Sequence, residues 1–390
     1  MPYTVYLKKG VEKKIVSGQT RVYANEIGKI EGKGKNGDLA SVLSFDGGFL
    51  GKGYINHLSK IPLRIFLWED VEPDGDFFRK KIEIAKAKRE KIGFDDCYRA
   101  FFSETDGLPG LIIDKYGDLL SVQILTLGME KNRETILRSL IEVFSPRGIF
   151  ERDDSPVREK EGLPAVKRKL YGDFDPHTIV TENGLKMTVD LENGQKTGYF
   201  LDQKENRLAI RRYCKGADVL DCFCNSGGFS LNAAAGGAKS ILSADISEKA
   251  LEDVRTNAEM NGFSNVIRTE CGDVFSLLRR FRKEERTFGL IVVDPPAFCK
   301  SVAEVQDAIR GYRDINLLAM KSVRKGGFLV TCSCSHYVTF PVFEKMLREA
   351  AVSSGRRVSL YEMRTQSADH ASLFCDAEGS YLKFYIFGID

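Results

Sequence analysis

No stretch of this 390-residue chain approaches the roughly 20 consecutive apolar residues that a membrane-spanning helix needs. The first residues, MPYTVYLKKGVEKK, carry charges with no apolar stretch behind them, so a signal peptide is not expected. An excess of one charge is also missing, since 58 Lys and Arg residues stand against 55 Asp and Glu residues. We therefore expect a cytoplasmic protein without a membrane partner, in which any nucleic-acid surface comes from local clusters of basic residues.

A disulfide framework is equally unexpected. The nine cysteines are an odd number spread over a long chain, which is typical of reduced thiols in the cytosol. Four of them form two C-x-C pairs, Cys222 with Cys224 and Cys332 with Cys334, whereas structural zinc sites usually have about two to four residues between paired ligands. We expect no metal site. Four other cysteines are interpreted as small buried hydrophobic side chains: Cys97, Cys214, Cys271 and Cys375.

The length predicts more than one domain, because a single hydrophobic core rarely grows past about 250–300 residues. Residues 1–72 consist of short candidate strands and glycine turns, a pattern that predicts a small β barrel. Basic loops beside aromatic residues in this segment favour contact with RNA, although a solvated basic face explains them equally well. Residues 73–192 predict a small α+β domain.

Three features describe this central domain. Residues 77–92 predict a helix that is basic and has apolar residues at i, i+4 and i+7 on one side. The pair Asn183-Gly184 predicts the turn of a β-hairpin. Residues 153–178 are polar and have no apolar period, so we expect them to be irregular.

Residues 193–390 form the third predicted domain. From Asp218 onward, candidate strands alternate with helices of about 10–15 residues, which predicts a parallel sheet in an α/β fold. Such sheets bind ligands at the C-terminal ends of their strands. Two closing strands, over residues 358–363 and 381–389, predict an antiparallel edge.

The segment DVLDCFCNSGGFSL, residues 218–231, organises this domain. It predicts a short strand that ends at Asp221, a turn with two glycines, and the start of a helix. Nucleotide-like ligands are held in this way, because glycine lets the backbone approach and a helix N-terminus offers free N–H groups. The dinucleotide pattern G-x-G-x-x-G is absent. A second candidate strand ends in Asp245, an acid that can accept both hydroxyls of a ribose. An ordinary βαβ turn with an exposed Asp is the alternative.

Acidic and cysteine-containing motifs recur where the candidate strands end. The motifs are DCFCNSGGFS (221–230), DPPAF (294–298) and TCSCS (331–335), with ETDGLPGLIIDKY (104–116), NGQKTGYFLDQKENR (193–207) and YLK (381–383) elsewhere. With these motifs the chain resembles, over nearly its whole length, the RlmI-like 23S rRNA (cytosine-C5) methyltransferases. That family consists of class I S-adenosylmethionine-dependent methyltransferases.

The resemblance has consequences for fold and partners. It implies a PUA-type RNA-binding β barrel in residues 1–72 and a small α+β domain in residues 73–192. It also implies a Rossmann-like methyltransferase domain in residues 193–390, with a mostly parallel seven-stranded sheet. S-Adenosylmethionine is the implied cofactor, and 23S rRNA or a ribosomal precursor particle is the implied partner. The sequence leaves the oligomeric state open, a homodimer included.

The resemblance also implies roles for single residues. The turn residues would hold the methionine end of the cofactor, Asp245 the ribose, and Asp273 the amino group of the adenine. Residues of the preceding linker would cover the cofactor. The full set implied for cofactor binding is Thr197, Phe200, Asp202, Asp221, Asn225, Ser226, Gly227, Gly228, Asp245, Ile246, Asp273, Asp294 and Pro295.

Methylation of cytosine carbon 5 explains why a cysteine is needed. Carbon 5 is a poor nucleophile, but a thiolate that adds to carbon 6 makes it enamine-like. The resemblance makes Cys334 the nucleophile, with Cys332 less suited, and it makes Asp294 the partner of the cytosine edge. Pro296 and Ala297 stand where two-cysteine enzymes of this type carry their other cysteine. We therefore expect a one-cysteine mechanism, with the base that removes the carbon-5 proton unassigned.

Two other functions stay open at this point. DPPAF also resembles the D/N-P-P-Y/F loop of enzymes that methylate exocyclic amines, a reaction that needs no cysteine. The other alternative is an RNA-binding protein with an inactive methyltransferase domain, against which the intact acids and glycines argue.

Overall fold

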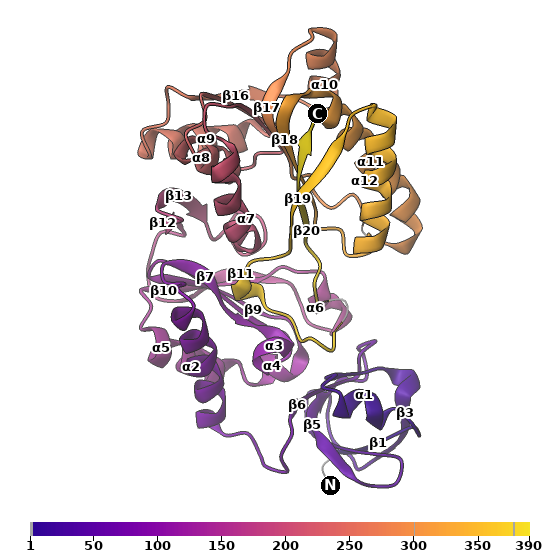
Figure 1. The fold of residues 1–390 in the computed structure, drawn as a ribbon. Coiled ribbons are helices and arrows are strands. Elements are labelled where there is room, and N and C mark those ends of the chain that lie inside the picture. Colours follow the sequence, from indigo (N-terminus) through magenta and orange to yellow (C-terminus); the bar gives the residue numbers. More distant parts are fainter. Residues whose placement is uncertain (1–2, 300, 377–378) are drawn as a thin grey trace. The chain divides into compact units, whose positions relative to one another are not determined.

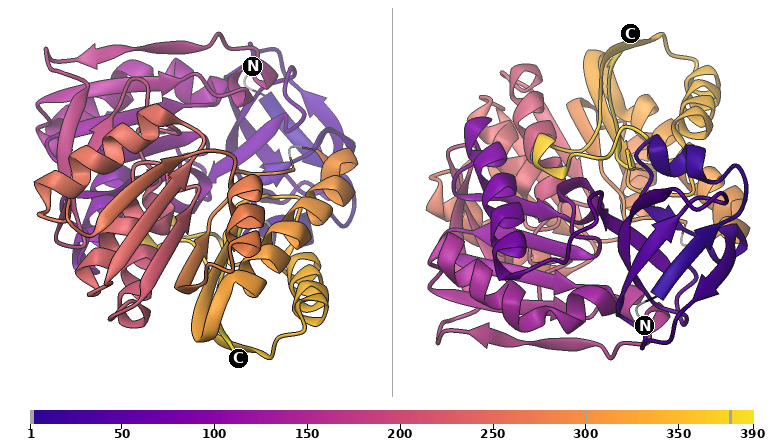
Figure 2. Two further views of the ribbon diagram at one scale, coloured as in Figure 1. Left: turned by 90° about the horizontal axis from the view of Figure 1, so that it is seen from above. Right: turned by 90° about the horizontal axis from the view of Figure 1, so that it is seen from below.

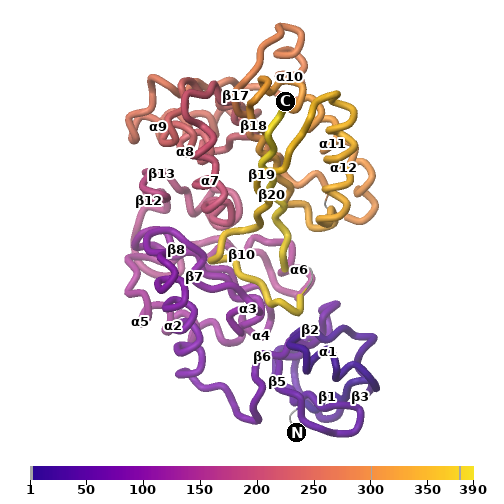
Figure 3. The backbone as a smooth tube through the Cα atoms, in the orientation of Figure 1, coloured from indigo at the N-terminus to yellow at the C-terminus, as the bar shows by residue number. Residues whose placement is uncertain are grey.

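The computed structural model describes residues 3–299, 301–376 and 379–390. The chain folds into two compact units, each made of several segments. The first comprises Met1–Val180, Val189–Leu201 and Asp369–Gly379, and the second comprises Thr181–Thr188, Asp202–Ala368 and Ser380–Asp390. Figure 3 traces this path, in which the yellow C-terminal stretch contributes to both units.

A six-stranded sheet forms the N-terminal part of the first unit, with the strand order β2-β6-β5-β4-β1-β3. Its elements are β1 (Tyr3–Leu7), α1 (Glu12–Val16), β2 (Arg21–Val22), η1 (Ala24–Glu26), β3 (Ile27–Glu31), β4 (Leu39–Leu43), β5 (Phe49–Ile55) and β6 (Leu63–Leu67). Side chains along β1 alternate between buried and half-buried, as expected for a strand with one face on a core. The predicted small β domain is confirmed.

The rest of the first unit is built on a five-stranded sheet of order β11-β10-β9-β8-β7. Its elements are α2 (Gly75–Lys91), β7 (Cys97–Phe102), α3 (Ser103–Asp106), β8 (Leu111–Tyr116), β9 (Leu119–Ile124), α4 (Leu127–Lys131), α5 (Arg133–Phe144), β10 (Gly148–Asp153), α6 (Val157–Lys160) and β11 (Val166–Tyr171). Helices α2 and α5 pack side by side (Figure 1). The side chain of Asp74 caps α2 by accepting from the Phe77 N–H at 2.8 Å. The predicted basic helix is confirmed, with Phe78, Ile82 and Ala85 buried.

The prediction that residues 153–178 are irregular was wrong. They contain α6 and β11, and β11 pairs with β10 in antiparallel register. Strand β11 is an edge strand, and its side chains over Lys167–Lys169 are exposed. An edge strand with few apolar residues lacks the alternation from which strands are predicted.

The predicted hairpin is confirmed. Its strands are β12 (His177–Glu182) and β13 (Leu185–Asp190). Asn183 and Gly184 connect them with φ of 55° and 76°, the left-handed values that a two-residue turn of this kind requires.

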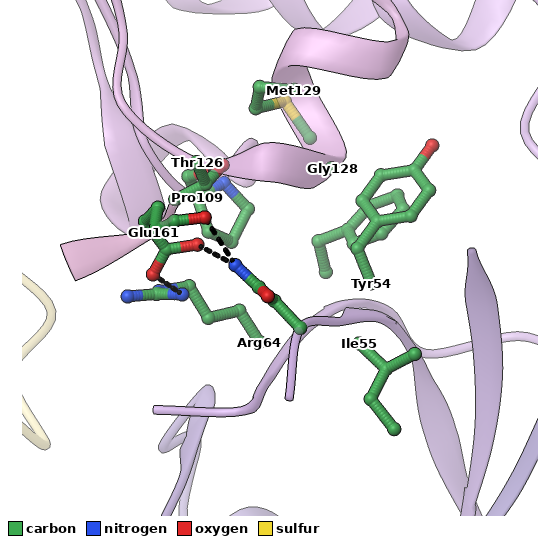
Figure 4. Close-up of a pocket in the computed structure, with 10 residues that line it drawn as sticks. Tyr54, Ile55, Arg64, Pro109, Thr126, Gly128, Met129 and Glu161 are labelled. Atoms are coloured by element: carbon green, nitrogen blue, oxygen red, sulfur yellow. Dashed lines mark hydrogen bonds and ion pairs between the residues drawn. The ribbon is translucent and has the colours of Figure 1, made fainter. Parts of the chain in front are cut away.

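A buried carboxylate fixes the β domain on the central sheet within the first unit. Glu161, just after α6, accepts from the Asn56 amide at 3.0 Å and from the Ser59 hydroxyl at 2.6 Å. It also pairs with the Arg64 guanidinium at 2.8 Å (Figure 4). The cavity beside them has a volume of only about 10 Å³, room for about one water molecule. Gly128 at the edge of this cavity allows the close packing, because a Cβ there would meet the Tyr54 ring at 2.4 Å.

The second unit contains a seven-stranded sheet of order β16-β15-β14-β17-β18-β20-β19. Its elements are η2 (Leu201–Gln203), α7 (Lys204–Ala209), η3 (Ile210–Tyr213), β14 (Asp218–Cys222), α8 (Gly228–Ala235), β15 (Ser240–Asp245), α9 (Glu248–Met260), β16 (Ile267–Cys271), α10 (Val274–Lys283), β17 (Phe288–Val293), η4 (Val302–Glu304), α11 (Val305–Ser322), β18 (Val323–Ser333), α12 (Phe340–Ser354), β19 (Val358–Arg364), η5 (Ala368–His370) and β20 (Lys383–Ile389). Strands β14 to β18 pair in parallel, and β20 pairs antiparallel to β18 and β19. The predicted fold, a mostly parallel seven-stranded sheet with an antiparallel edge, is confirmed.

Helices cover this sheet, as Figures 1 and 2 show, with α8 and α9 on one face and α10, α11 and α12 on the other. Buried side chains of α10, α11 and α12 form one core with the sheet, for example Phe281, Tyr312 and Phe343. Strand β14 lies centrally, and the chain continues to β15 on one side and later to β17 on the other. Ligands bind α/β sheets at such a reversal of strand order.

Candidate active site

The turn after β14 is held by the acid at the end of β15. Asn225 adopts a left-handed conformation with φ of 48° and donates its N–H to the Asp245 carboxylate at 3.0 Å. The other oxygen of Asp245 accepts from the Ser247 N–H at 3.0 Å, at the start of α9. Asp245 is half-buried, so it fixes the turn and still faces solvent at the strand tip.

Asp221, at the end of β14, is buried and only partly satisfied. One carboxylate oxygen accepts from the Ser230 N–H at 2.9 Å and from its hydroxyl at 2.6 Å. The other oxygen has no hydrogen-bond partner among the described residues. Burial raises the pKa of Asp221 to about 7, and the negative charges of Asp294 and Asp245 act in the same direction. Three carboxylates therefore converge here, and a positively charged ligand would relieve their repulsion.

The glycine turn itself has one unused polar group. The Ser226 hydroxyl is buried and has no hydrogen-bond partner among the described residues, while the Asn257 amide holds the Ser226 carbonyl at 2.9 Å. Gly227 has φ of 84°, and a Cβ there would come within 3.1 Å of the Val254 side chain. Gly228 begins α8. The turn thus suits close approach of a polar ligand to the backbone.

Ile246, after β15, and Asp273, after β16, offer a ligand different kinds of contact. The Ile246 side chain is 74% exposed, directly after Asp245, and an exposed apolar group beside an acid suits the flat ring of a base. Asp273 is exposed and caps α10 by accepting from the Ser276 N–H at 2.9 Å. Its implied contact with the adenine amino group stays a prediction.

The linker residues that are predicted to cover the cofactor are distributed over the two units. Thr197 and Phe200 belong to the first unit, where the Thr197 hydroxyl is buried and bonded to the Asp114 carboxylate. Asp202 belongs to the second unit and is buried, and it accepts from the Tyr381 hydroxyl at 2.6 Å. The roles of these residues toward the cofactor stay predictions.

The end of β17 meets the end of β18. Asp294 is half-buried and accepts from the Gln203 side-chain amide at 3.1 Å, and Pro295 after it is buried. The Cys332 thiol is fully buried, which raises its pKa well above the ordinary value, and the charge of Asp294 raises it further. Cys332 is therefore held as a neutral thiol. The sequence did not single out Gln203, although this residue lies within the motif NGQKTGYFLDQKENR.

Cys334 lies one residue beyond the end of β18 and is half-buried. Ser335 after it is buried, and its hydroxyl pairs with the Tyr312 hydroxyl at 2.8 Å. The ammonium of Lys383, the first residue of β20, donates to the Ser335 carbonyl at 2.7 Å. Cys334 is thus a thiol with access to solvent in a turn that buried groups hold in place. Lys383 is the last residue of the YLK motif, but the sequence predicted no role for it.

The other cysteines follow the prediction only in part. Cys97 and Cys214 are buried, as predicted. Cys271 is exposed and Cys375 is half-buried, so for these two the prediction of burial was wrong. Cys271 ends the edge strand β16, where one side of the strand is open to solvent. No group of three or more candidate metal ligands occurs in the described part of the chain.

Comparison with known proteins identifies the family. The chain is 40% identical to ribosomal RNA large subunit methyltransferase I of Vibrio cholerae, and the match covers 98% of both chains. The proteins of that name from Shewanella amazonensis and Erwinia tasmaniensis are 40% and 38% identical, again over 98% of both chains. The chain belongs to this family. Residues 168–360 match the family model for S-adenosylmethionine-dependent methyltransferases, and residues 5–68 match the model for PUA-like domains.

Solved structures support the fold of this family member. A methyltransferase described as SMU.776, complexed with SAH, superposes with a TM-score of 0.85 over the whole of both chains at 22% identity. A tRNA m1G37 methyltransferase of M. jannaschii superposes with a TM-score of 0.51, over 97% of this chain and 95% of that one, at 18% identity. At these identities the likeness concerns the fold alone. The predicted class I methyltransferase fold with an N-terminal PUA-like domain is thereby confirmed.

The family settles the cofactor, S-adenosylmethionine, and the strand tips fit it. The sulfonium and amino groups of this cofactor are cationic. The Asp221 oxygen that lacks a partner among the described residues lies where negative charge converges. The buried Ser226 hydroxyl and the exposed Ile246 side chain supply further polar and apolar contacts.

No helix in the described part of the chain is long and apolar enough to cross a membrane.

Proposed function

We propose that this protein methylates carbon 5 of a cytosine in 23S rRNA through a covalent bond between Cys334 and carbon 6. The observation that carries the proposal is the contrast between two neighbouring thiols. Cys334 is half-buried just beyond β18, whereas Cys332 is sealed in the core with a raised pKa. A nucleophile must reach the cytosine as a thiolate, and the partial exposure of Cys334 supports this role for it over Cys332.

The proposed reaction begins with addition. The Cys334 thiolate forms a bond to carbon 6 of the flipped-out cytosine, and the electron pair of the C5–C6 double bond moves toward carbon 5. S-Adenosylmethionine, when bound, supplies the methyl group that carbon 5 then takes. A base removes the carbon-5 proton, the double bond returns, and the sulfur–carbon bond breaks to give back the thiolate. The base stays unassigned.

Asp294 would orient the cytosine while the sulfur adds. Its carboxylate is held by the Gln203 amide at 3.1 Å, and Gln203 in turn accepts from the Asn206 amide at 2.8 Å. A carboxylate held in this way can accept a hydrogen bond from the amino group of the cytosine and orient the ring for the addition. Pro295 is buried and limits the mobility of this loop.

For the cofactor we propose the turn Asn225–Gly228 at the methionine end, Asp245 at the ribose and Ile246 beside the adenine. The backbone N–H of Asn225 already occupies one oxygen of Asp245, at 3.0 Å, so the ribose hydroxyls would share this carboxylate with the turn. That arrangement would couple the shape of the turn to the bound ribose. Thr197, Phe200 and Asp202 would cover the cofactor, and Asp273 would meet the amino group of the adenine.

The names of the relatives support large-subunit ribosomal RNA as the substrate. We propose that residues 1–72 bind RNA, residues 73–192 form the central domain and residues 193–390 carry out the transfer. A ribosomal precursor particle is an alternative form of the substrate, and a homodimer is compatible with the proposal.

The second candidate is methylation of an exocyclic amine by the DPPAF loop. The side chain of Asp294 favours it, because a held carboxylate at this position can also accept a hydrogen bond from an amino group. That reaction does not use Cys334. Cys334→Ala should therefore abolish methylation of carbon 5 and spare methylation of an amine.

The test is nucleoside analysis of rRNA from cells that lack this protein, after incubation with S-adenosylmethionine and the purified enzyme. We expect 5-methylcytidine with the wild type and none with Cys334→Ala. Cys271→Ala, at an exposed thiol, is the matched control and should act as the wild type does. N4-methylcytidine as the product, or undiminished transfer by Cys334→Ala, would overturn the proposal.

A further inference from the structure

Lys383 is a buried cation with an unusual set of partners. Lys383 is the first residue of β20 and is only 1% exposed. The ammonium donates to the carbonyls of Ser335 and Tyr381, each at 2.7 Å. Across the described ranges it makes no ion pair with a carboxylate. Lys52, the buried lysine of the β domain, instead pairs with Asp70 at 2.9 Å and Glu72 at 3.0 Å.

Such an arrangement is costly unless another group compensates for it. A buried ammonium loses its hydration, and two neutral carbonyls replace only part of it. Burial accordingly lowers the pKa of Lys383 to about 8, and the one group that acts in the opposite direction is the Cys334 thiol. The position of the cation is therefore explained if its natural partner is a thiolate.

Several contacts fix the ammonium at the turn that carries Cys334. Ser335, which follows Cys334, is held by the Tyr312 hydroxyl at 2.8 Å. The hydroxyl of Tyr381 donates to the buried Asp202 carboxylate at 2.6 Å. Both carbonyls that anchor Lys383 thus belong to residues whose side chains are themselves bonded. An ammonium has three donors, so a third N–H is available for the sulfur of Cys334.

Among the described residues, the other groups that pack near this turn are neutral or acidic. Burial raises the pKa of Tyr312, on α11, to about 12, so this phenol stays neutral. Cys332 stays neutral as well, and Asp294 beyond it is an acid. From α12 the contact is the Phe340 ring, whose centre is 6.0 Å from the Lys383 ammonium. His336 and Tyr337 are the remaining titratable groups of this turn among the described residues, and both are exposed.

We propose that Lys383 is a positioning residue that holds Cys334 ready as a thiolate by placing a buried ammonium beside its sulfur. The inference rests on the proposed function, in which Cys334 is the nucleophile. The S–H proton of Cys334 passes to solvent, and Lys383 keeps its three protons. The sulfur loses its negative charge when it bonds to carbon 6. When the sulfur–carbon bond breaks, the thiolate forms again and pairs with the ammonium.

Alkylation of the full-length protein by iodoacetamide, followed over pH by peptide mass spectrometry, tests the pair without RNA or cofactor. Wild-type Cys334 should react with a midpoint below about 8.5, the ordinary value for a thiol. In Lys383→Met the midpoint should move upward, and the rate at pH 7 should fall by about tenfold or more. Lys383→Arg keeps the charge and should restore most of the rate. His336→Gln should leave the midpoint of Cys334 in place.

The exposed Cys271 is measured in the same samples as an internal reference and should react equally in all variants. A Cys334 midpoint at or above that of an ordinary thiol in the wild type would overturn the inference even if Lys383→Met does not fold. So would an unchanged midpoint in a folded Lys383→Met. The proposed function fails differently: a lowered midpoint with no 5-methylcytidine would leave the ion pair standing and remove the carbon-5 reaction. The reverse result, 5-methylcytidine with an ordinary midpoint, would remove only the role of Lys383.

Discussion

Two groups of buried ionisable side chains, one in each unit, are satisfied to different degrees. In the first unit, Glu161 has an amide, a hydroxyl and a guanidinium as partners, and Asp153 pairs with the Arg158 guanidinium at 2.7 Å. In the second unit, Asp221 has one oxygen without a partner among the described residues, and Lys383 has carbonyls where a carboxylate would be expected. Fully paired charges hold a scaffold together. Partly satisfied charges mark the place where a ligand or a reaction supplies the rest.

Asp153 shows that a shifted pKa alone does not make this distinction. Burial raises the pKa of Asp153, and the neighbouring Glu151 contributes to the rise. Both of its oxygens are nevertheless taken, one by the Ile124 N–H at 2.6 Å and the other by Arg158. The feature that separates Glu161 and Asp153 from Asp221 is therefore whether a carboxylate oxygen lacks a hydrogen-bond partner among the described residues. Four variants probe the scaffold, the site and, as a contrast, the exposed surface.

The largest effect is expected for Glu161→Ala. The substitution removes a carboxylate that is 2% exposed and leaves the Arg64 charge buried without its partner. We expect the free energy of unfolding to fall by about 3–5 kcal/mol, measured by urea denaturation followed by circular dichroism. The exposed neighbour Glu159→Ala is the control and should change it little. Equal stability of the two variants would contradict a structural role for the pairing.

Asp245→Ala is expected to act on the ligand more than on the fold. It removes the proposed ribose acceptor and the partner of the Asn225 N–H. Affinity for S-adenosylmethionine, measured by calorimetry, should weaken by about 1–3 kcal/mol. Glu252→Ala, at an exposed position of α9, should bind as the wild type does. Unchanged affinity in Asp245→Ala would remove this residue from the site.

Asp221 should make stability depend on pH in a defined window. Its folded-state pKa of about 7 lies above the ordinary value of 3.8, so the folded chain binds more protons than the unfolded chain between these values. Its contribution to the free energy of unfolding should therefore be lost as the pH rises from about 4 to about 7. In Asp221→Asn, whose amide oxygen can still accept from Ser230, this part of the pH dependence should vanish. The measurement is the difference between wild-type and variant denaturation curves across that range, and a constant difference would speak against the raised pKa.

The smallest effect is expected at the surface of the β domain. Lys33 and Lys35 are exposed. Replacing both by Ala should weaken binding of rRNA fragments several-fold at low salt and reduce the slope of log affinity against log salt by about 2. Filter binding over a salt series measures the slope, and affinity for S-adenosylmethionine should not change. An unaltered slope would place the RNA on another surface.

Much of the fold was predictable because local patterns agree with it. The alternation of strands and helices after Asp218 and the Asn183-Gly184 turn are each decided by neighbours in sequence. Strand β11 was missed because an exposed edge strand carries no apolar alternation. The exposure of Cys271 was missed for a related reason, since the sequence does not show which strand lies at the edge of the sheet.

The site was predictable as a set of motifs and less so as a set of contacts. The family resemblance drew attention to the tips of β14, β15, β17 and β18, where the structure places the predicted acids and cysteines. The second role of Asp245, as partner of the Asn225 N–H, depends on the path of a turn. The positions of Gln203 and Lys383 depend on hydrogen bonds between segments more than 45 residues apart, which no local pattern specifies. Lys383 and Ser335, for example, are 48 residues apart in the sequence.

Trapping the covalent intermediate tests the central claim most directly. In RNA whose cytosines carry fluorine at carbon 5, no proton can leave after methyl transfer, so the enzyme should stay bound through Cys334. With S-adenosylmethionine present, we predict a protein–RNA species that survives a denaturing gel in the wild type and in Cys271→Ser. It should be absent in Cys334→Ser, because a serine hydroxyl is far less ionised than a thiol. A trapped species that persists in Cys334→Ser, or no trapped species from an enzyme that methylates the unmodified RNA, would contradict the account.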